Sequence, residues 1–167
     1  MLYNFFNIEE CNEIIEFGET LDFWFDNSKD ELETEGFKYH FVPLNTRNKF
    51  KYESKINEVF EKSTSFKINQ SLIRLLRFKK GENLPTHSYD YTLLANTNYY
   101  TDTKFCINIF LSPNNSKFYL NNNSIEYNMG EGIIINRTDR GKLDAVKSDY
   151  FYMLMSHIKT DTRLYAI

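Results

Sequence analysis

The sequence contains only two cysteines, Cys11 and Cys106. Two thiols at this spacing fit neither a disulfide framework nor a zinc motif. Cys11 falls in a helix-like segment and Cys106 in an apolar, strand-like one. We therefore expect two buried free thiols of a protein in a reducing compartment, and a cytoplasmic location.

Long hydrophobic runs and clusters of basic residues are also missing. No stretch approaches the roughly 18 apolar residues of a membrane span. The N-terminus, MLYNFFNIEEC, has no basic region before its apolar residues, unlike a secretory signal. The net charge is −3, and no Lys/Arg-rich run occurs. We expect no membrane and no nucleic acid among the partners.

Glycine and proline are scarce, whereas aromatic residues are abundant. The 6 Gly and 3 Pro contrast with 15 Phe and 12 Tyr. Few turn formers and many aromatic side chains favour packed strands over disordered linkers. A length of 167 residues is typical of a single domain with its own apolar core.

Two segments in the first part of the chain have the period of amphipathic helices. Residues 8–21 place apolar side chains on one face, and Asn7 with Glu10 three residues on forms a capping-box pattern. Residues 51–62 predict a second helix. The acidic stretch 26–35 between them is predicted to be a loop.

After Gln70 the hydrophobic period changes to two, which is typical of strands. Clusters of Asn, Gly and Pro separate the strand-like runs, and Asn121–Asn123 is predicted to be a hairpin loop. Two helices followed by short strands indicate an α+β domain with helices supporting one face of a barrel or sandwich. The predicted strands are 71–78, 104–112, 117–120, 124–127, 131–136 and 149–159. The alternating residues Phe105, Ile107, Ile109 and Leu111 are expected in the barrel core.

The order of these motifs resembles the prolyl-4-hydroxylase-type 2-oxoglutarate/Fe(II) oxygenases, especially the compact viral and bacterial ones. The resemblance runs from the helix NFFNIEECNEII through LIRLLRFKKGENLPTHSYDY, FCINIFLSPN and YNMGEGIIINRTDRG to DAVKSDYFYMLMSHIKT. It implies a double-stranded β-helix of the jelly-roll or cupin kind over residues 1–167. Residues 1–70 would form a helical support region and residues 71–167 the β-helix core.

Enzymes of this family hold Fe(II) with two histidines and one carboxylate. The resemblance places the first histidine at His87. The carboxylate is expected two residues later, on the same strand face, where Tyr89 stands. Asp90 could replace it only if a bulge shifts the phase of the strand. The second histidine position falls on Gly141, or on Asp144 in a rival alignment.

The family also pairs the far carboxylate of 2-oxoglutarate with a basic residue on the last strand. The resemblance places this residue at Phe151, whereas Lys147 and Lys159 are out of register. One of the four expected groups, His87, is therefore retained. We expect no cofactor, and Fe(II) with 2-oxoglutarate only if the protein is a divergent active enzyme.

The interior of such a barrel would remain concave without the metal. Strand alternation and the family register predict that aromatic and a few polar side chains line it, a composition common in ligand pockets. We expect the bulky side chains to fill this cavity rather than leave it open. The predicted lining is His87, Tyr89, Tyr91, Asn108, Phe110, Gly141, Phe151 and Met153.

Three functions follow from the sequence. The first is an inactive oxygenase fold that binds a small ligand or a protein partner, in the cytoplasm of a cell or an infected host. The second is a divergent hydroxylase of prolyl or other protein side chains. The third is a structural protein of a larger assembly, of which a viral one is an example. Loss of three of the four groups favours the first.

Overall fold

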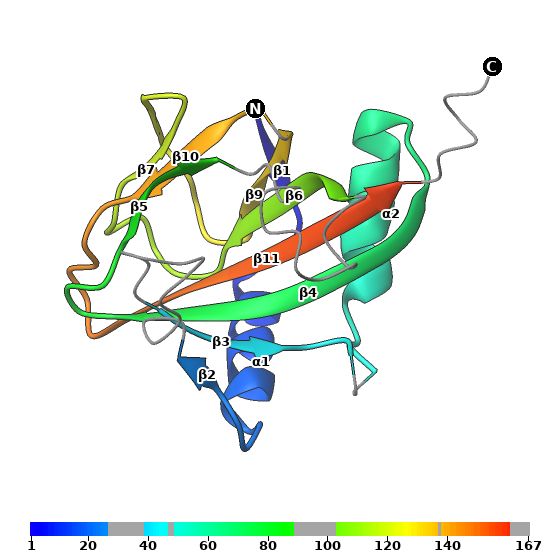
Figure 1. The fold of residues 1–167 in the computed structure, drawn as a ribbon. Coiled ribbons are helices and arrows are strands. Elements are labelled where there is room, and N and C mark those ends of the chain that lie inside the picture. The colour runs from blue at the N-terminus through cyan, green and yellow to red at the C-terminus, as the bar shows by residue number, and fades with distance from the viewer. Residues whose placement is uncertain (27–38, 47–48, 89–102, 137, 161–167) are drawn as a thin grey trace.

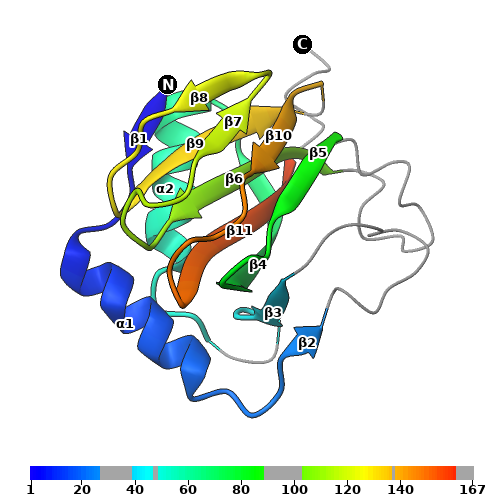
Figure 2. The same cartoon turned by 90° about the vertical axis from the view of Figure 1, so that its left-hand side faces the viewer.

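Two β-sheets and two helices make up the computed structural model, which describes residues 1–26, 39–46, 49–88, 103–136 and 138–160. The major sheet has seven strands in the order β1-β9-β6-β11-β4-β3-β2, and the minor sheet has four in the order β5-β10-β7-β8. Figures 1 and 2 show the two sheets. The major-sheet strands are β1 (Leu2–Asn4), β2 (Phe25–Asp26), β3 (His40–Pro43), β4 (Ile68–Lys79), β6 (Thr103–Phe110), β9 (Glu131–Asn136) and β11 (Tyr150–Thr160). The minor-sheet strands are β5 (Leu84–Ser88), β7 (Phe118–Leu120), β8 (Asn123–Ile125) and β10 (Arg140–Leu143).

The helices lie where the periodicity predicts them. Helix α1 spans Ile8–Glu19, and its capping box is formed as expected: the side chain of Asn7 accepts a hydrogen bond from Glu10 N at 2.8 Å, and Glu10 accepts one from Asn7 N at 3.0 Å. Helix α2 spans Glu53–Thr64 and ends at Ser65, whose φ of 64° is left-handed. Both helices pack their apolar sides on the major sheet.

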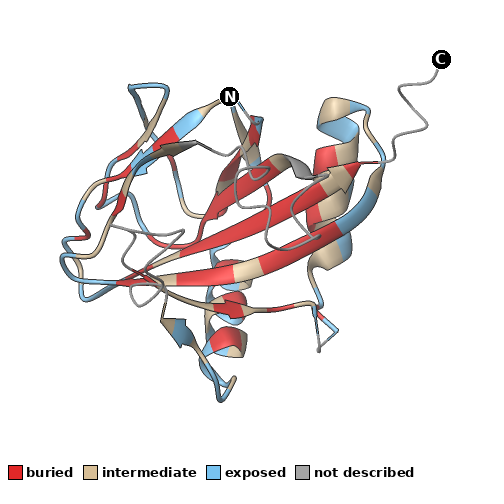
Figure 3. Ribbon diagram, viewed as in Figure 1, coloured by how far each residue is buried: buried red, intermediate tan, exposed pale blue. Residues whose placement is uncertain are grey.

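Two apolar cores follow from this arrangement, one on each face of the major sheet. Figure 3 shows buried residues along the central strands of this sheet and on both helices. One core lies between the sheet and the helices, and the other fills the barrel between the two sheets. The stripe Phe105, Ile107, Ile109 and Leu111 was expected in the barrel core. It packs instead in the core beneath the helices, because the opposite face of β6, with Cys106 and Phe110, turns into the barrel.

The six predicted strands all occur, with ends displaced by up to three residues. The structure adds strands that the sequence pattern does not reveal. β1, β2 and β3 come from the first 70 residues and join both edges of the major sheet, while β5 and β10 belong to the minor sheet. These strands have two to five residues, too few for a period of two to stand out. Asn121 and Asn122 have positive φ values of 52° and 68° in the hairpin between β7 and β8. Cys11 and Cys106 are buried free thiols, as expected.

Gly130 connects the N-terminal segment to the barrel. Its N–H donates to Phe110 O at 2.7 Å, and its carbonyl accepts from Phe5 N at 2.9 Å and Phe6 N at 3.1 Å. Its φ is +88°, and an added Cβ would lie 1.9 Å from Phe6 O. A side chain at this position would therefore meet rigid backbone in addition to an unfavourable φ.

Gly81 provides a matched control for the effect of φ alone, because its φ is +87° and an added Cβ would have no neighbour within 4 Å. We expect Gly81→Ala to lower the free energy of unfolding by about 1–2 kcal/mol. Gly130→Ala should lower it by a further 1 kcal/mol or more, roughly the cost of overpacking. Urea denaturation of both variants measures the difference, and equal losses would contradict the close contact at Gly130.

Candidate functional site

The minor sheet brings two of the predicted site positions together. In the antiparallel pairing of β5 and β10, Gly141 lies directly opposite His87, and on its other side Gly141 lies opposite Leu120 of β7. Gly141 and Leu143 are buried, whereas Arg140 and Lys142 are exposed, so Gly141 belongs to the inward face of the sheet. Directly opposed Cα atoms in such a ladder are about 4.5–5.5 Å apart. A side chain at position 141 would therefore stand beside the His87 imidazole.

His87 itself is half-buried, and its ring faces backbone carbonyls. Its Nδ1 lies 2.8 Å from the carbonyl oxygen of Pro85, which can only accept a hydrogen bond. Burial lowers the pKa of His87 below its ordinary value, although the carbonyls of Pro85 and Gly141 favour the charged ring. The imidazole is thus mainly neutral near pH 7, the form in which histidine binds metals.

The other candidate ligands do not join His87 in the described structure. Tyr89, Asp90 and Tyr91 lie outside the described residues. Asp144 contacts the Tyr119 hydroxyl at 3.3 Å and Lys142 Nζ at 3.5 Å. The register thus places Gly141, and not Asp144, opposite His87. Within the described ranges, no three His, Cys, Asp or Glu side chains are grouped so that they could hold a metal ion.

The position expected to hold a basic residue, Phe151, lies in a packed group of aromatic rings. Phe151 is fully buried, and its ring centroid lies 6.2 Å from that of Phe78 and 6.4 Å from that of Tyr127. Phe110 stacks on Tyr127 at 3.9 Å, and the Tyr127 hydroxyl donates to Ser116 O at 2.5 Å. We call this group the aromatic plug; it consists of Phe78, Phe110, Phe118, Tyr127 and Phe151. Met153, also fully buried, belongs to the same core.

The aromatic plug fills the end of the barrel where β11 begins. Toward the other end of the major sheet, the inward side chains become polar: Arg74 of β4, Asn108 of β6 and His157 of β11. His87 lies toward the same end, because β5 runs away from the turn that follows β4. Asn108 belongs to the predicted lining, whereas Arg74 and His157 do not. Arg74 could have been predicted to point inward from the sequence. It precedes Leu76 by two residues and Phe78 by four, so all three side chains share one face of β4.

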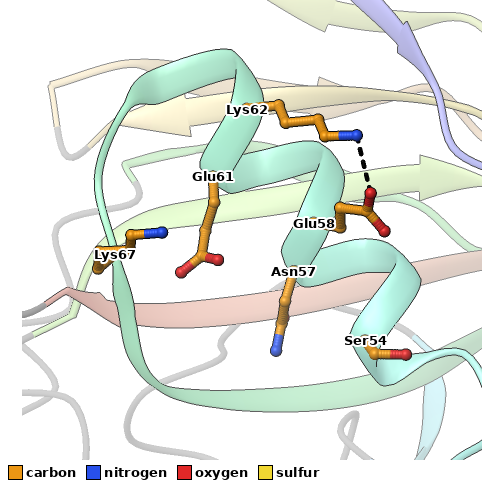
Figure 4. A pocket seen from close by; sticks show the side chains of 6 residues that line it. All are labelled: Ser54, Asn57, Glu58, Glu61, Lys62 and Lys67. Carbon is orange, nitrogen blue, oxygen red and sulfur yellow. Dashed lines mark hydrogen bonds and ion pairs between the residues drawn. The ribbon is translucent and has the colours of Figure 1, made fainter.

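Two hollows on the outer surface lie away from the barrel interior. One, of about 470 Å³, runs along α2 and is shown in Figure 4. There Lys62 pairs with Glu58 at 2.8 Å, and Glu61 accepts a hydrogen bond from Ile68 N at 2.8 Å. The other, of about 300 Å³, lies over β5, β7 and β10 and is lined by Thr86, Tyr119, Asn122, Arg140, Gly141 and Lys142. The charged groups in the first hollow satisfy local structure and mark no reactive site.

No family model and no curated protein matches the sequence. No helix in the described ranges is long and apolar enough to cross a membrane. The fold, however, is similar to that of a prolyl-4-hydroxylase from Pseudomonas putida, with a TM-score of 0.68 and 8% identity over 95% of this chain and 91% of that one.

Two further solved structures are similar over most of their length. The viral collagen prolyl hydroxylase of Paramecium Bursaria Chlorella virus-1 has a TM-score of 0.63, 14% identity and coverage of 96% of both chains. A 2OG-Fe(II) oxygenase family oxidoreductase from Burkholderia pseudomallei has a TM-score of 0.63 and 12% identity over 92% of this chain and 80% of that one. The chain therefore has the double-stranded β-helix fold of the prolyl-4-hydroxylase-like 2-oxoglutarate/Fe(II) oxygenases.

Proposed function

We propose that this protein is an inactive form of the oxygenase fold that acts by binding a ligand or a protein partner. The observation that carries the proposal is the register of β5 and β10, in which the residue opposite His87 is Gly141. A glycine offers no ligand atom at the point where a second imidazole would complete a metal site.

The described residues do not fit Fe(II). His87 supplies one nitrogen, and Asp144 makes its contacts with Lys142 and Tyr119. A single neutral imidazole gives a weak site for a metal that this fold normally holds with three side chains. We therefore assign no iron-dependent reaction to the described residues.

The residue at the position expected to be basic, Phe151, also does not fit the far carboxylate of 2-oxoglutarate. Phe151 is fully buried among aromatic rings. An ionised carboxylate placed there would lose its water without gaining a cation, which is strongly unfavourable. The plug supports our expectation that bulky side chains fill this part of the cavity.

The direct test is turnover of 2-oxoglutarate. With Fe(II), ascorbate and 2-oxoglutarate, we expect the natural protein to release no more succinate than His87→Ala does, while an active prolyl hydroxylase assayed alongside gives a clear signal. Fe(II)-dependent release that disappears in His87→Ala would contradict the proposal. It would favour a divergent hydroxylase in which Asp90 supplies the carboxylate.

A further inference from the structure

The hollow of about 300 Å³ lies over three adjacent strands of the minor sheet, β5, β10 and β7, which Figure 2 shows side by side. We call it the minor-sheet hollow. Arg140 and Lys142 are exposed and flank the buried Gly141 on β10, so both side chains leave the face that turns away from the barrel. Tyr119 of β7 lies directly opposite Lys142 and therefore stands on the same outward face.

The minor-sheet hollow concentrates positive charge on a chain whose net charge is −3. Its described lining contains two cations and no acidic side chain. Lys142 has an acidic partner outside this lining, Asp144, at 3.5 Å. Asp139, the neighbour of Arg140 in the chain, directs its two carboxylate oxygens to Asn121 Nδ2 and to a backbone N–H instead. Within the part of the chain that the structure describes, no acid therefore neutralises Arg140.

Neutral donors complete the lining, and the backbone holds them in place. Asn121 N donates a hydrogen bond to Arg140 O at 2.8 Å, and Arg140 N donates one to Asn121 Oδ1 at 2.9 Å. This double link fixes the tip of the β7–β8 hairpin beside Arg140. The next residue, Asn122, contributes an amide to the lining, and Thr86 contributes a hydroxyl from β5, on the other side of β10. A ligand that meets these groups would order little of the backbone on binding.

We propose that the minor-sheet hollow binds the phosphate group of a small phosphate monoester. Arg140 and Lys142 pair with its charges, and the Tyr119 ring packs against its organic part. The inference rests on the proposed binding function, because it names a class of ligand, but the site lies outside the barrel. The volume is at the lower end of ligand pockets, which suits a phosphate with a small organic group.

The two cations distinguish a phosphate monoester from anions that carry one charge. A monoester has about two negative charges near pH 7 and three acceptor oxygens. The guanidinium of Arg140 can form two parallel hydrogen bonds with it, and the ammonium of Lys142 adds a second point charge. Their Cα atoms are about 7 Å apart along β10, so both long side chains can reach one group. A carboxylate or a sulfate ester would leave one of the cations without a charge to pair with.

Phenyl phosphate and phenyl sulfate test the site as a matched pair. They have nearly the same shape and differ by about one negative charge near pH 7. Calorimetry of the natural protein in EDTA, at constant ionic strength, measures both affinities. We expect phenyl phosphate to bind about tenfold or more tightly than phenyl sulfate, because its second charge meets a second cation. It should also bind more tightly than inorganic phosphate, which has no ring to pack on Tyr119.

Two exposed lysines with acidic partners provide a matched variant and control. Lys142 pairs with Asp144, whereas Lys62 pairs with Glu58 and lines the hollow along α2. Lys142→Met and Arg140→Met should each weaken phenyl phosphate binding about tenfold and reduce its preference over phenyl sulfate. Lys62→Met removes the same charge from the protein and should change neither affinity. Circular dichroism of each variant checks that the fold is kept.

Four results would overturn the inference. Equal binding, or no binding, of phenyl phosphate and phenyl sulfate by the natural protein does so without any variant. The others are a preference that survives the combined change of Arg140 and Lys142 to Met, a loss in Lys62→Met as large as in Lys142→Met, and equal binding of inorganic and phenyl phosphate. None of these involves iron or the barrel interior. They are therefore distinct from Fe(II)-dependent succinate release, which would overturn the inactive-enzyme proposal instead.

Discussion

Replacing Phe151 by alanine should lower the free energy of unfolding by about 3–5 kcal/mol, the usual cost of deleting a buried aromatic side chain. Phe151 is fully buried and contacts the rings of Phe78 and Tyr127, which belong to β4 and to the segment before β9. Removing its ring opens a cavity where both sheets meet. The neighbouring side chains cannot collapse into it, because they are held by their own strands.

Tyr150→Ala is the matched control on the adjacent residue. Tyr150 is 50% exposed, with its ring centroid 6.2 Å from that of Tyr152 and 5.9 Å from the guanidinium carbon of Arg77. Its replacement should cost about 1 kcal/mol or less. Chemical denaturation of both variants measures the two losses. A loss at Phe151 as small as that at Tyr150 would show that the plug is not packed.

Restoring imidazole at position 141 should create a metal site. In Gly141→His, the new ring would project from the inward face of β10 directly opposite the His87 imidazole. Two imidazoles on opposed residues of a ladder can bind one transition metal ion. We expect anaerobic titration with Fe(II) or Co(II) to show an affinity at least about a hundredfold above that of the natural protein, or about 2.7 kcal/mol.

The controls for this variant test whether metal binding depends on the register of β5 and β10 or only on the presence of one more histidine. Lys142→His adds an imidazole one residue further, where the side chain is exposed and turned outward, and should not bind. Adding His87→Ala to Gly141→His should abolish the gain. Adding Tyr89→Asp should increase it further if the resemblance assigns that position correctly. Metal binding by Lys142→His comparable to that by Gly141→His would contradict the register.

The fold could be predicted largely from local patterns and the order of motifs. The capping box at Asn7, the change of period after Gln70 and the asparagine hairpin at residues 121–123 each depend on residues close together in the sequence. Such patterns can be recognised without knowledge of tertiary contacts, because they reflect backbone preferences and side-chain alternation. The short strands β1, β2, β3, β5 and β10 were missed, because their few residues carry no readable alternation.

The sequence by itself determined which side chains are present at the positions of the resemblance: His87, Gly141 and Phe151. Only the tertiary structure decided which positions meet. β6 is apolar on both faces, so alternation separates its two faces without showing which one turns to the helices. That choice turned the predicted lining residues Phe110 and Asn108 into the barrel, and Ile107 and Ile109 toward the helices. The meeting of the polar residues Arg74, Asn108 and His157 depends on the same step, because they are distant in sequence and adjacent only through the register of β4, β11 and β6.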